Sequence, residues 1–308
     1  MLVAVLTYRR PADLAAALPL LLEQARSVDP PAAVLVVDND PDGGARATVG
    51  AFAGVRYAHE PTPGIAAGRN RALDEADTDL LVFIDDDERP AAGWLAALVA
   101  TWRETRPTGV VGPVVSEFAA EPDPWIVAGR FFERRRPATG TEVQVAATNN
   151  LLLDLAAVRA LGLRFDERFG LTGGSDTLFT RQLVRRGGRL VWCAEAGVVD
   201  VVPADRLTRR WVLRRAFRSG NGASVVEVEL ARGPAEHLRV RARQVAQGLA
   251  RIGGGALKVA AGWATGSVAH RASGTRNLAR GAGLVSGAFG HVFTEYGRPA
   301  AGSGPAQA

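Results

Sequence analysis

The chain has little of several features that would place it in other protein classes. It has one cysteine among 308 residues, Cys193, so no intrachain disulfide can form and a cysteine-rich metal site is excluded. The uncharged runs near its end, 259–270 and 281–294, are too short and too glycine-rich for a membrane-spanning helix. Its start has neither a basic leader nor a cleavage-site pattern, so we predict no secretory signal and a cytoplasmic protein.

Charge is divided unevenly along the chain. The net charge is +5. From Asp205 onward there are 16 Lys+Arg and 5 Asp+Glu, a balance of +11, which leaves −6 for residues 1–204. An acidic front can hold a cation, and a basic back can face a polyanion such as anionic lipid or nucleic acid. An ordinary solvated surface explains the basic part as well. With 47% hydrophobic residues, the length fits one large α/β domain plus an appendage.

The most informative stretch runs from Leu80 to Glu88. Five apolar residues lead directly into four acids, beginning at Asp85. A short continuous apolar run is typical of a strand buried on both faces, and open α/β sheets bind ligands at the carboxyl ends of such strands. Asp85 and Asp87 should point the same way, and two such carboxylates repel unless a cation lies between them. We therefore favour a magnesium or manganese site over a solvated acidic turn that caps the next helix.

Apolar strands alternate with helical patterns through the first two thirds of the chain. Strands are predicted at 2–6, 33–37, 55–57, 80–84, 109–115, 189–193 and 198–203, and helices at 11–25, 65–73, 90–102 and 177–186. Pro19 is expected to kink or divide the first helix. Segment 117–140 is polar and proline-containing, which predicts a long loop. The strand–helix–strand order predicts a doubly wound α/β fold.

A glycine-containing loop precedes the second of these helices. Backbone N–H groups after Gly64 could meet a phosphate, with Arg69 or Arg71 adding charge-assisted hydrogen bonds. An ordinary exposed basic helix explains the same residues equally well.

Two polar segments further along have an interpretation that needs no ligand. Asn149 and Asn150 could bind a polyol, but we favour a turn cap. Ser175 or Asp176 could cap the helix that follows them.

Five segments occur in an order shared by one known family. They are Thr7-Tyr8, Val36-Val37-Asp38-Asn39, Gly64-Ile65-Ala66-Ala67-Gly68-Arg69-Asn70, Ile84-Asp85-Asp86-Asp87, and Gly174-Ser175-Asp176 with Arg181-Gln182-Leu183 and Gly187-Gly188. The series resembles the family-two glycosyltransferases, inverting enzymes with a GT-A fold, and Asp85-x-Asp87 is similar to their DXD motif. The resemblance covers residues 1 to about 220. Ser175 stands where the family usually has Glu.

The chain departs from the family pattern at two places. Asp200-Val201-Val202-Pro203 lacks the His of a His-x-Pro setting, which leaves a second protein ligand for the metal unidentified. Leu207 stands at the Gln position of the Gln-x-x-Arg-Trp motif of processive members, which argues against polymer synthesis.

The resemblance implies a GT-A fold with a doubly wound, mixed, mostly parallel sheet. It also implies transfer of a sugar from a nucleoside-diphosphate sugar to a glycan or lipid-linked acceptor, in cell-envelope or surface glycan or glycolipid synthesis. A divalent cation, Mn²⁺ or Mg²⁺, would assist, and an inverting displacement needs a base but no protein nucleophile. The implied residues are Asp176 as the base, Asp87 with Asp85 at the metal, and Thr7, Asp38, Arg69, Asp85 and Asp86 at the nucleotide sugar.

The C-terminal region forms the expected appendage. We predict a catalytic domain over residues 1–220 and a basic, amphipathic helical region over 221–308. Apolar residues repeat there at spacings of four and three among arginines: Leu238, Ala242, Val245, Leu249 and Ile252. This stripe predicts peripheral attachment to the inner face of the cell membrane, with packing on the catalytic domain or on a second subunit as the alternative.

Three rival functions follow from the same acids. A metal-dependent nucleotidyltransferase would need a glycine-rich signature near the first strand and a phosphate-binding lysine, but Arg9-Arg10-Pro11 lacks the glycines and Lys258 is the only lysine. A phosphatase of the haloacid dehalogenase type would need an Asp pair where Thr7-Tyr8 stands. An inactive sugar-nucleotide-binding partner protein is the non-enzyme alternative. Nucleic acid is not an expected partner.

Overall fold

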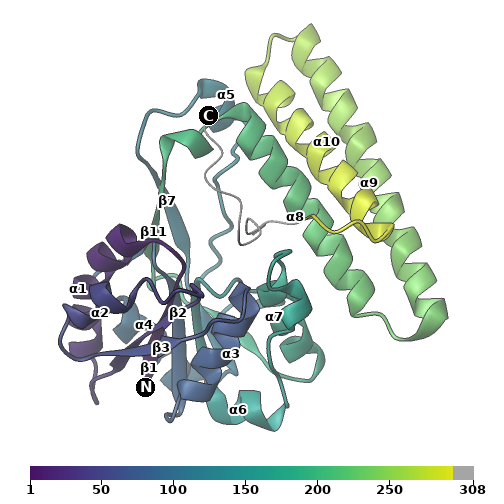
Figure 1. Cartoon of the computed structure of the whole chain (residues 1–308). Coiled ribbons are helices and arrows are strands. Elements are labelled where there is room, and N and C mark those ends of the chain that lie inside the picture. The colour runs from purple at the N-terminus through teal and green to yellow at the C-terminus, as the bar shows by residue number, and fades with distance from the viewer. Residues whose placement is uncertain (294–308) are drawn as a thin grey trace.

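A computed structural model describes residues 1–293 (Figure 1). Its centre is a mixed, eight-stranded sheet in the order β3-β2-β1-β4-β9-β6-β10-β8. The strands are β1 (Leu2–Thr7), β2 (Ala33–Asp38), β3 (Val55–His59), β4 (Leu80–Asp85), β6 (Gly109–Val111), β8 (Glu142–Val143), β9 (Asn150–Asp154) and β10 (Leu190–Trp192). The first four strands in this order, from β3 to β4, are parallel to one another, and β9 is antiparallel to both of its neighbours. The predicted doubly wound, mostly parallel sheet is confirmed.

Helices cover both faces of this sheet because its central strands are apolar on both sides. Alternate residues of β1 point to opposite faces: Val3 and Val5 belong to one buried cluster, Leu2 and Ala4 to the other. The first cluster includes α1 (Pro11–Arg26) and α4 (Trp94–Thr105). The second includes α3 (Ile65–Glu75), α6 (Leu155–Ala160) and α7 (Ser175–Arg185). The short helix α2 (Arg46–Gly50) lies between β2 and β3 in the chain.

A second, three-stranded sheet has the order β5-β11-β7. Its strands are β5 (Glu88–Pro90), β11 (Val198–Val202) and β7 (Val114–Phe118). The single strand predicted over 109–115 is therefore wrong, because β6 and β7 belong to different sheets. The chain changes sheets at Gly112-Pro113, where proline has no N–H to donate and a Cβ on Gly112 would collide with Asn150 and the carbonyl of Ala196.

Two further expectations need correction. The first helix is not divided at Pro19, since α1 is continuous from residue 11 to 26. Pro19 is exposed, so water can reach the carbonyl that loses its helical hydrogen bond. The expected loop 117–140 contains the short helix α5 (Pro124–Ala128), whose first turn is capped by the carboxylate of Asp123. Two single-turn 3₁₀ helices, η1 (Glu167–Phe169) and η2 (Ala204–Arg206), complete the body.

Three helices form the C-terminal part: α8 (Arg209–Glu229), α9 (Gly233–Ala264) and α10 (Val268–Ala288). Figure 1 shows α9 and α10 side by side, with α10 next to α8. The α9–α10 pair is packed backbone to backbone through glycines. A Cβ on Gly255 would lie 2.8 Å from the carbonyl oxygen of Gly274, and one on Gly281 would lie 2.7 Å from that of Gly248.

The division of the chain at residue 220 stays a prediction, since α8 runs across this position. The part of the predicted C-terminal region that covers residues 294–308 lies outside the described residues. None of the helices in residues 1–293 combines the length and the apolarity needed to cross a bilayer.

Candidate active site

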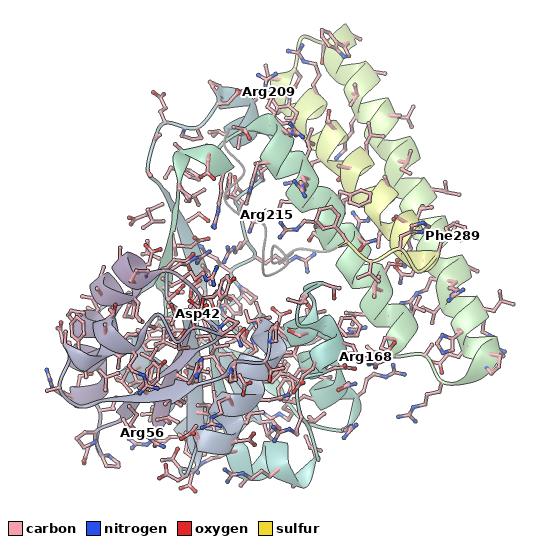
Figure 2. The ribbon with its side chains drawn as sticks, viewed as in Figure 1. Asp42, Arg56, Arg168, Arg209, Arg215 and Phe289 are labelled. Carbon is pink, nitrogen blue, oxygen red and sulfur yellow. The ribbon has the colours of Figure 1, made fainter. Side chains whose placement is uncertain are left out.

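The carboxyl ends of three neighbouring strands bring the predicted residues to one edge of the main sheet. Thr7 ends β1 and is paired in register with Asp38, which ends β2. Asp85 ends β4 and pairs with Leu6 of β1. Asp86 and Asp87 follow in the turn before β5. Asp42 lies at this edge of the body, below α8 (Figure 2).

Asp86 is held by the first strand and the loop after it. Its carboxylate is almost fully buried and accepts hydrogen bonds from Thr7 Oγ1 at 2.7 Å and from Arg10 Nη1 at 3.3 Å. Burial raises the pKa of Asp86 to about 6, although Thr7 and Arg10 both act to lower it. The same Arg10 nitrogen donates to Asp87 at 2.7 Å, so one guanidinium bridges two carboxylates. Arg10 was missed in the sequence, where the only signal was its position just past the first strand.

Asp85 is the point at which the charged groups of the site meet. Burial raises its pKa to about 7; Arg69 opposes this shift, and Asp87, Asp86 and Asp176 add to it. Asp176 from α7 and Arg69 from α3 are therefore close enough to Asp85 to act on its charge. Asp176 and Arg69 belong to different elements from Asp85, and the fold brings them near it at this edge.

Glu88 is a fourth acid that no sequence argument had assigned a role. It is 1% exposed, and its Oε1 accepts a 2.6 Å hydrogen bond from Asn149 Nδ2. Its Oε2 is buried and has no hydrogen-bond partner among residues 1–293. Burial, followed by the nearby charge of Asp85, raises the pKa of Glu88 well above its ordinary value. The site therefore holds more buried carboxylate than its own arginines neutralise.

The loop before α7 supplies the predicted base. Gly173 and Gly174 have positive φ angles, and Ser175 and Asp176 form the first turn of the helix. The expected capping role is wrong, because the residue at the cap position is Gly174 and it makes no side-chain cap. Ser175 is buried instead, and its Oγ accepts a 2.7 Å hydrogen bond from Arg69 Nη1. Asp176 Oδ1 accepts from the backbone N–H of Thr177 at 2.7 Å.

Arg69 and Arg71, which the sequence left equivalent, are separated by the fold. Arg69 is 6% exposed and points at Ser175, with its guanidinium over the ring of Phe165 at 5.5 Å. Arg71 forms a 2.6 Å ion pair with Glu75 within its own helix. Of the two, Arg69 belongs to the candidate site.

Asp38 is fully buried beneath the loop that follows β2. Its carboxylate accepts hydrogen bonds from the backbone N–H groups of Asp40 and Ala45, at 3.0 and 2.8 Å, and from the Tyr57 hydroxyl at 3.0 Å. Burial and this hydrogen bond raise the pKa of Tyr57 to about 12. Asp38 therefore fixes the shape of the loop; its predicted contact with a nucleotide stays a prediction.

The two side-chain amides that were expected to cap a turn, those of Asn149 and Asn150, instead bond to residues of other segments around the acids. Asn149 bonds to Glu88, as described above. Asn150 donates to the carbonyl oxygens of Pro113 and Ala196, at 3.1 and 2.7 Å, and accepts from Trp94 Nε1 at 2.9 Å. It ties three segments together, so the expected turn cap is wrong.

A divalent cation would meet suitable oxygen donors here. Asp85 and Asp87 carry hard carboxylate oxygens, and beside them the buried Oε2 of Glu88 has no hydrogen-bond partner among residues 1–293. No three His, Cys, Asp or Glu side chains within residues 1–293 are gathered into a metal-binding group. The protein would thus supply part of the ligand set, as is common for Mg²⁺, which one or two carboxylates and substrate phosphates hold together.

Comparisons with known proteins identify the family to which the chain is similar. A family model described as "Glycosyl transferase family 2" matches residues 2–162. The chain is 34% identical over 236 residues to the "Succinoglycan biosynthesis protein ExoM" of Rhizobium meliloti (strain 1021), covering 75% of this chain and 76% of that protein. It is 28% identical over 189 residues to the "Pre-mycofactocin glycosyltransferase" of Mycobacterium tuberculosis (strain ATCC 25618 / H37Rv), covering 57% and 38%.

Two solved structures share the fold. S. aureus TarS 1-349 superposes with a TM-score of 0.53 at 16% identity, covering 89% of this chain and 88% of that one. GalNAc-T7 with UDP, GalNAc and Mn²⁺ gives a TM-score of 0.52 at 12% identity, covering 79% and 53%. At these identities the likeness concerns the fold alone, and it confirms the expected GT-A architecture with a helical C-terminal part.

Proposed function

The chain belongs to glycosyl transferase family 2, and we propose that it transfers a sugar from a nucleoside-diphosphate sugar to an acceptor hydroxyl with inversion. It is an enzyme of the glycosyltransferase type. The observation that carries the finer proposal is the convergence of Asp85, Asp176 and Arg69 at the carboxyl edge of the sheet. Family membership argues against the nucleotidyltransferase and phosphatase alternatives.

The acid edge is proposed to receive the donor. Asp87 and Asp85 would hold a divalent cation, Mn²⁺ or Mg²⁺, and Arg10 would release Asp87 to it. When bound, the cation would neutralise charge that develops on the leaving diphosphate. Thr7 holds Asp86 beside the same edge, and Asp86 orients Arg10. Thr7, Asp38, Arg69, Asp85 and Asp86 remain the proposed nucleotide-sugar-binding residues, with Asp38 acting through the loop that it shapes.

Asp176 is proposed as the general base. Inversion needs a proton acceptor beside the attacking hydroxyl, on the side of the sugar away from the leaving group. Asp176 comes from α7, whereas Asp87 comes from the turn between β4 and β5, so the two carboxylates reach the edge from different elements. Its Oδ1 accepts only local hydrogen bonds, from Thr177, and no ion pair within residues 1–293 neutralises it. Such a carboxylate can take the proton of the acceptor hydroxyl as the new bond forms.

The product is proposed to be a glycan or glycolipid of the cell envelope, made one sugar at a time. The relative named for succinoglycan biosynthesis supports this assignment. The absence of Gln at position 207 supports a single, non-processive transfer. The experiment that tests the proposal mixes the protein with Mn²⁺ and a panel of sugar nucleotides and follows release of the nucleoside diphosphate. Release separates an enzyme from an inactive sugar-nucleotide binder.

We also propose that α9 rests on the anionic inner face of the cell membrane. Its glycine face packs on α10, and two large residues of the apolar stripe remain uncovered: Leu238 and Leu249 are 70% and 57% exposed. Ile252, at the end of the stripe, lies beside Gly281 of α10. Trp263, further along the helix, is 70% exposed as well. The +11 balance of the C-terminal part supplies charge complementarity to anionic lipid. The protein would thus be cytoplasmic and peripheral, close to a lipid-linked acceptor.

A further inference from the structure

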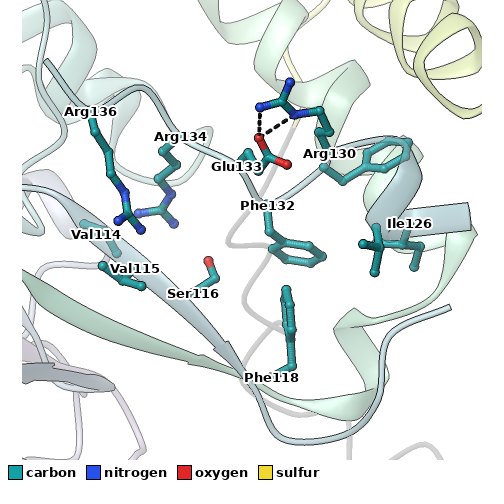
Figure 3. Close-up of a pocket in the computed structure, with 12 residues that line it drawn as sticks. Val114, Val115, Ser116, Phe118, Ile126, Arg130, Phe132, Glu133, Arg134 and Arg136 are labelled. Carbon is teal, nitrogen blue, oxygen red and sulfur yellow. Dashed lines mark hydrogen bonds and ion pairs between the residues drawn. The ribbon is translucent and has the colours of Figure 1, made fainter. Parts of the chain in front are cut away.

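A cavity of about 480 Å³ opens beside the small sheet (Figure 3). Its walls are β7, α5 and the segment 130–136. Apolar side chains form most of the lining, among them Val115, Phe118, Ile126 and Phe132. The rings of Phe118 and Phe132 meet edge to face at 5.3 Å. A cavity of this size and character suits a small ligand with an apolar portion.

Three arginines also line this mostly apolar cavity. Arg130 is paired with Glu133, and Arg134 with Asp200 at 3.2 Å. Arg136 has no ion pair or hydrogen bond with any of residues 1–293. Figure 3 shows Arg134 and Arg136 side by side above Val114 and Val115. One guanidinium is therefore available for an anion at the end of the apolar lining.

A further positive charge lies next to Phe132, one of the aromatic residues that line the cavity. Arg215 of α8 stacks over both Phe132 and Trp211, at 5.4 and 5.5 Å. Burial, followed by the nearby charge of Arg134, lowers the pKa of Arg215 to about 10, with Asp200 opposing this shift. Figure 2 places Arg215 on α8 between the helical part and the body. A bound anion would stabilise this crowded group of guanidinium ions.

The cavity is also adjacent to the proposed catalytic edge. Glu88 of β5 pairs with Asp200 of β11, and Asp200 pairs with Ser116 of β7, which lines the cavity. Two strand spacings separate Glu88 from Ser116, about 10 Å. The hydroxyl oxygen of Ser116 is buried and has no partner within residues 1–293. A ligand seated here would extend from the cavity toward the acids.

We propose that this cavity binds the lipid end of the acceptor: the first part of a hydrocarbon chain that carries a phosphate or diphosphate. The chain would lie against Phe118 and Phe132, and the phosphate would meet Arg134 and Arg136. The sugar attached to that phosphate would then extend past Ser116 to the catalytic edge. This inference rests on the proposed glycosyl transfer and adds the class of acceptor. A bare saccharide fits less well, because the lining offers few hydrogen-bonding groups besides the arginines.

Binding of a short isoprenoid diphosphate tests the cavity without any sugar transfer. Farnesyl diphosphate is titrated calorimetrically into the full-length chain in EDTA, so that no cation can hold a diphosphate at the acid edge. Farnesol lacks the phosphate, inorganic diphosphate lacks the chain, and UDP is a diphosphate that should not compete. The variants are Arg136→Met and Val127→Asp, the latter at a 56% exposed position of the lining where folding is little at risk. Arg26→Met, at an exposed position of helix α1, removes the same charge elsewhere.

We expect farnesyl diphosphate to bind at least 10-fold more tightly than farnesol or inorganic diphosphate. Loss of one charge-assisted hydrogen bond should weaken its binding roughly 10- to 100-fold in Arg136→Met, while Arg26→Met binds as the unmodified chain does. No binding, equal binding of farnesol, displacement by UDP, or unchanged binding in both cavity variants would each overturn the inference. Hydrolysis of a sugar nucleotide by the unmodified chain in Mn²⁺ is measured separately. A chain that hydrolyses a donor yet fails to bind farnesyl diphosphate refutes the cavity inference and leaves the proposed function standing.

Discussion

Two neighbouring glycines of α9 should respond in opposite directions to the same substitution. A Cβ on Gly254 would meet nothing within 4 Å, whereas a Cβ on Gly255 would lie 2.8 Å from the carbonyl oxygen of Gly274. Alanine in an exposed helix interior is favoured over glycine by roughly 1 kcal/mol. Gly254→Ala should therefore stabilise the protein by up to about that amount. Gly255→Ala gains the same helix propensity but forces α9 and α10 apart, and overpacking of this kind typically costs about 1–3 kcal/mol.

The two variants should then differ by about 1–3 kcal/mol in the free energy of unfolding. For a chain of this length that difference corresponds to roughly 2–5 °C in Tm, with Gly254→Ala the more stable. Thermal unfolding followed by circular dichroism measures it, and each variant is the control for the other. If both substitutions shift Tm equally and in the same direction, α9 does not pack on α10 through its glycine face. The apolar stripe would then be a candidate packing surface again.

Three other predictions concern the site and the membrane. Asp176→Asn should lower transfer by ~10²–10⁴ while donor binding survives, because the amide cannot accept a proton; unchanged transfer would move the base to another group, such as Glu117 on β7 or Glu121 in the loop after it. Asp85→Asn should stabilise the metal-free protein more at pH 8 than at pH 5. The folded-state pKa of Asp85 is raised from 3.8 to about 7, so ionisation of this buried carboxyl destabilises the folded protein increasingly as pH rises through that range, and asparagine avoids this loss. A difference in Tm between Asp85→Asn and the unmodified chain that does not grow with pH refutes this. Leu249→Glu and added salt should each weaken co-sedimentation with anionic vesicles, and equal binding to neutral vesicles, or none to either, rules out the electrostatic anchor.

Local pattern was sufficient to predict the strand that carries the acids. Leu80 to Ile84 is apolar throughout and buried on both faces, so the position of Asp85 at a strand end followed from the sequence. The resemblance motifs added Thr7, Arg69 and Asp176, and the fold brings these residues to the same edge. Their roles remain proposals.

The partners that set the charge of the site were not predictable in this way. Asn149 reaches Glu88 across 61 residues, and Arg10 reaches Asp86 across 76. Such contacts depend on which strands become neighbours, and periodicity in one segment does not contain that information. The burial of Asp38 has the same origin, because its partner Tyr57 lies on the adjacent strand.

The C-terminal helices show the opposite situation, in which a readable pattern was overlooked. Gly248, Gly255 and Gly262 recur every seven residues, and all three are buried. The sequence pattern of α9 offers two surfaces for packing, the glycine repeat and the apolar stripe, and the stripe alone does not decide between them. In the structure small residues allow the helix backbones to approach, so the larger side chains of Leu238 and Leu249 remain exposed.

The most direct test of the proposed function is donor hydrolysis by the purified full-length chain. Mn²⁺ and a panel of sugar nucleotides are supplied without acceptor, and release of the nucleoside diphosphate is followed over time. We predict slow release from at least one donor, lost in excess chelator and in Asp87→Ala. The matched variant Asp77→Ala, at an exposed position before the amino end of β4, should retain it. Release from no donor by a chain that circular dichroism finds folded, or equal release in chelator and in Asp87→Ala, would contradict a metal-assisted glycosyl transfer centred on these acids.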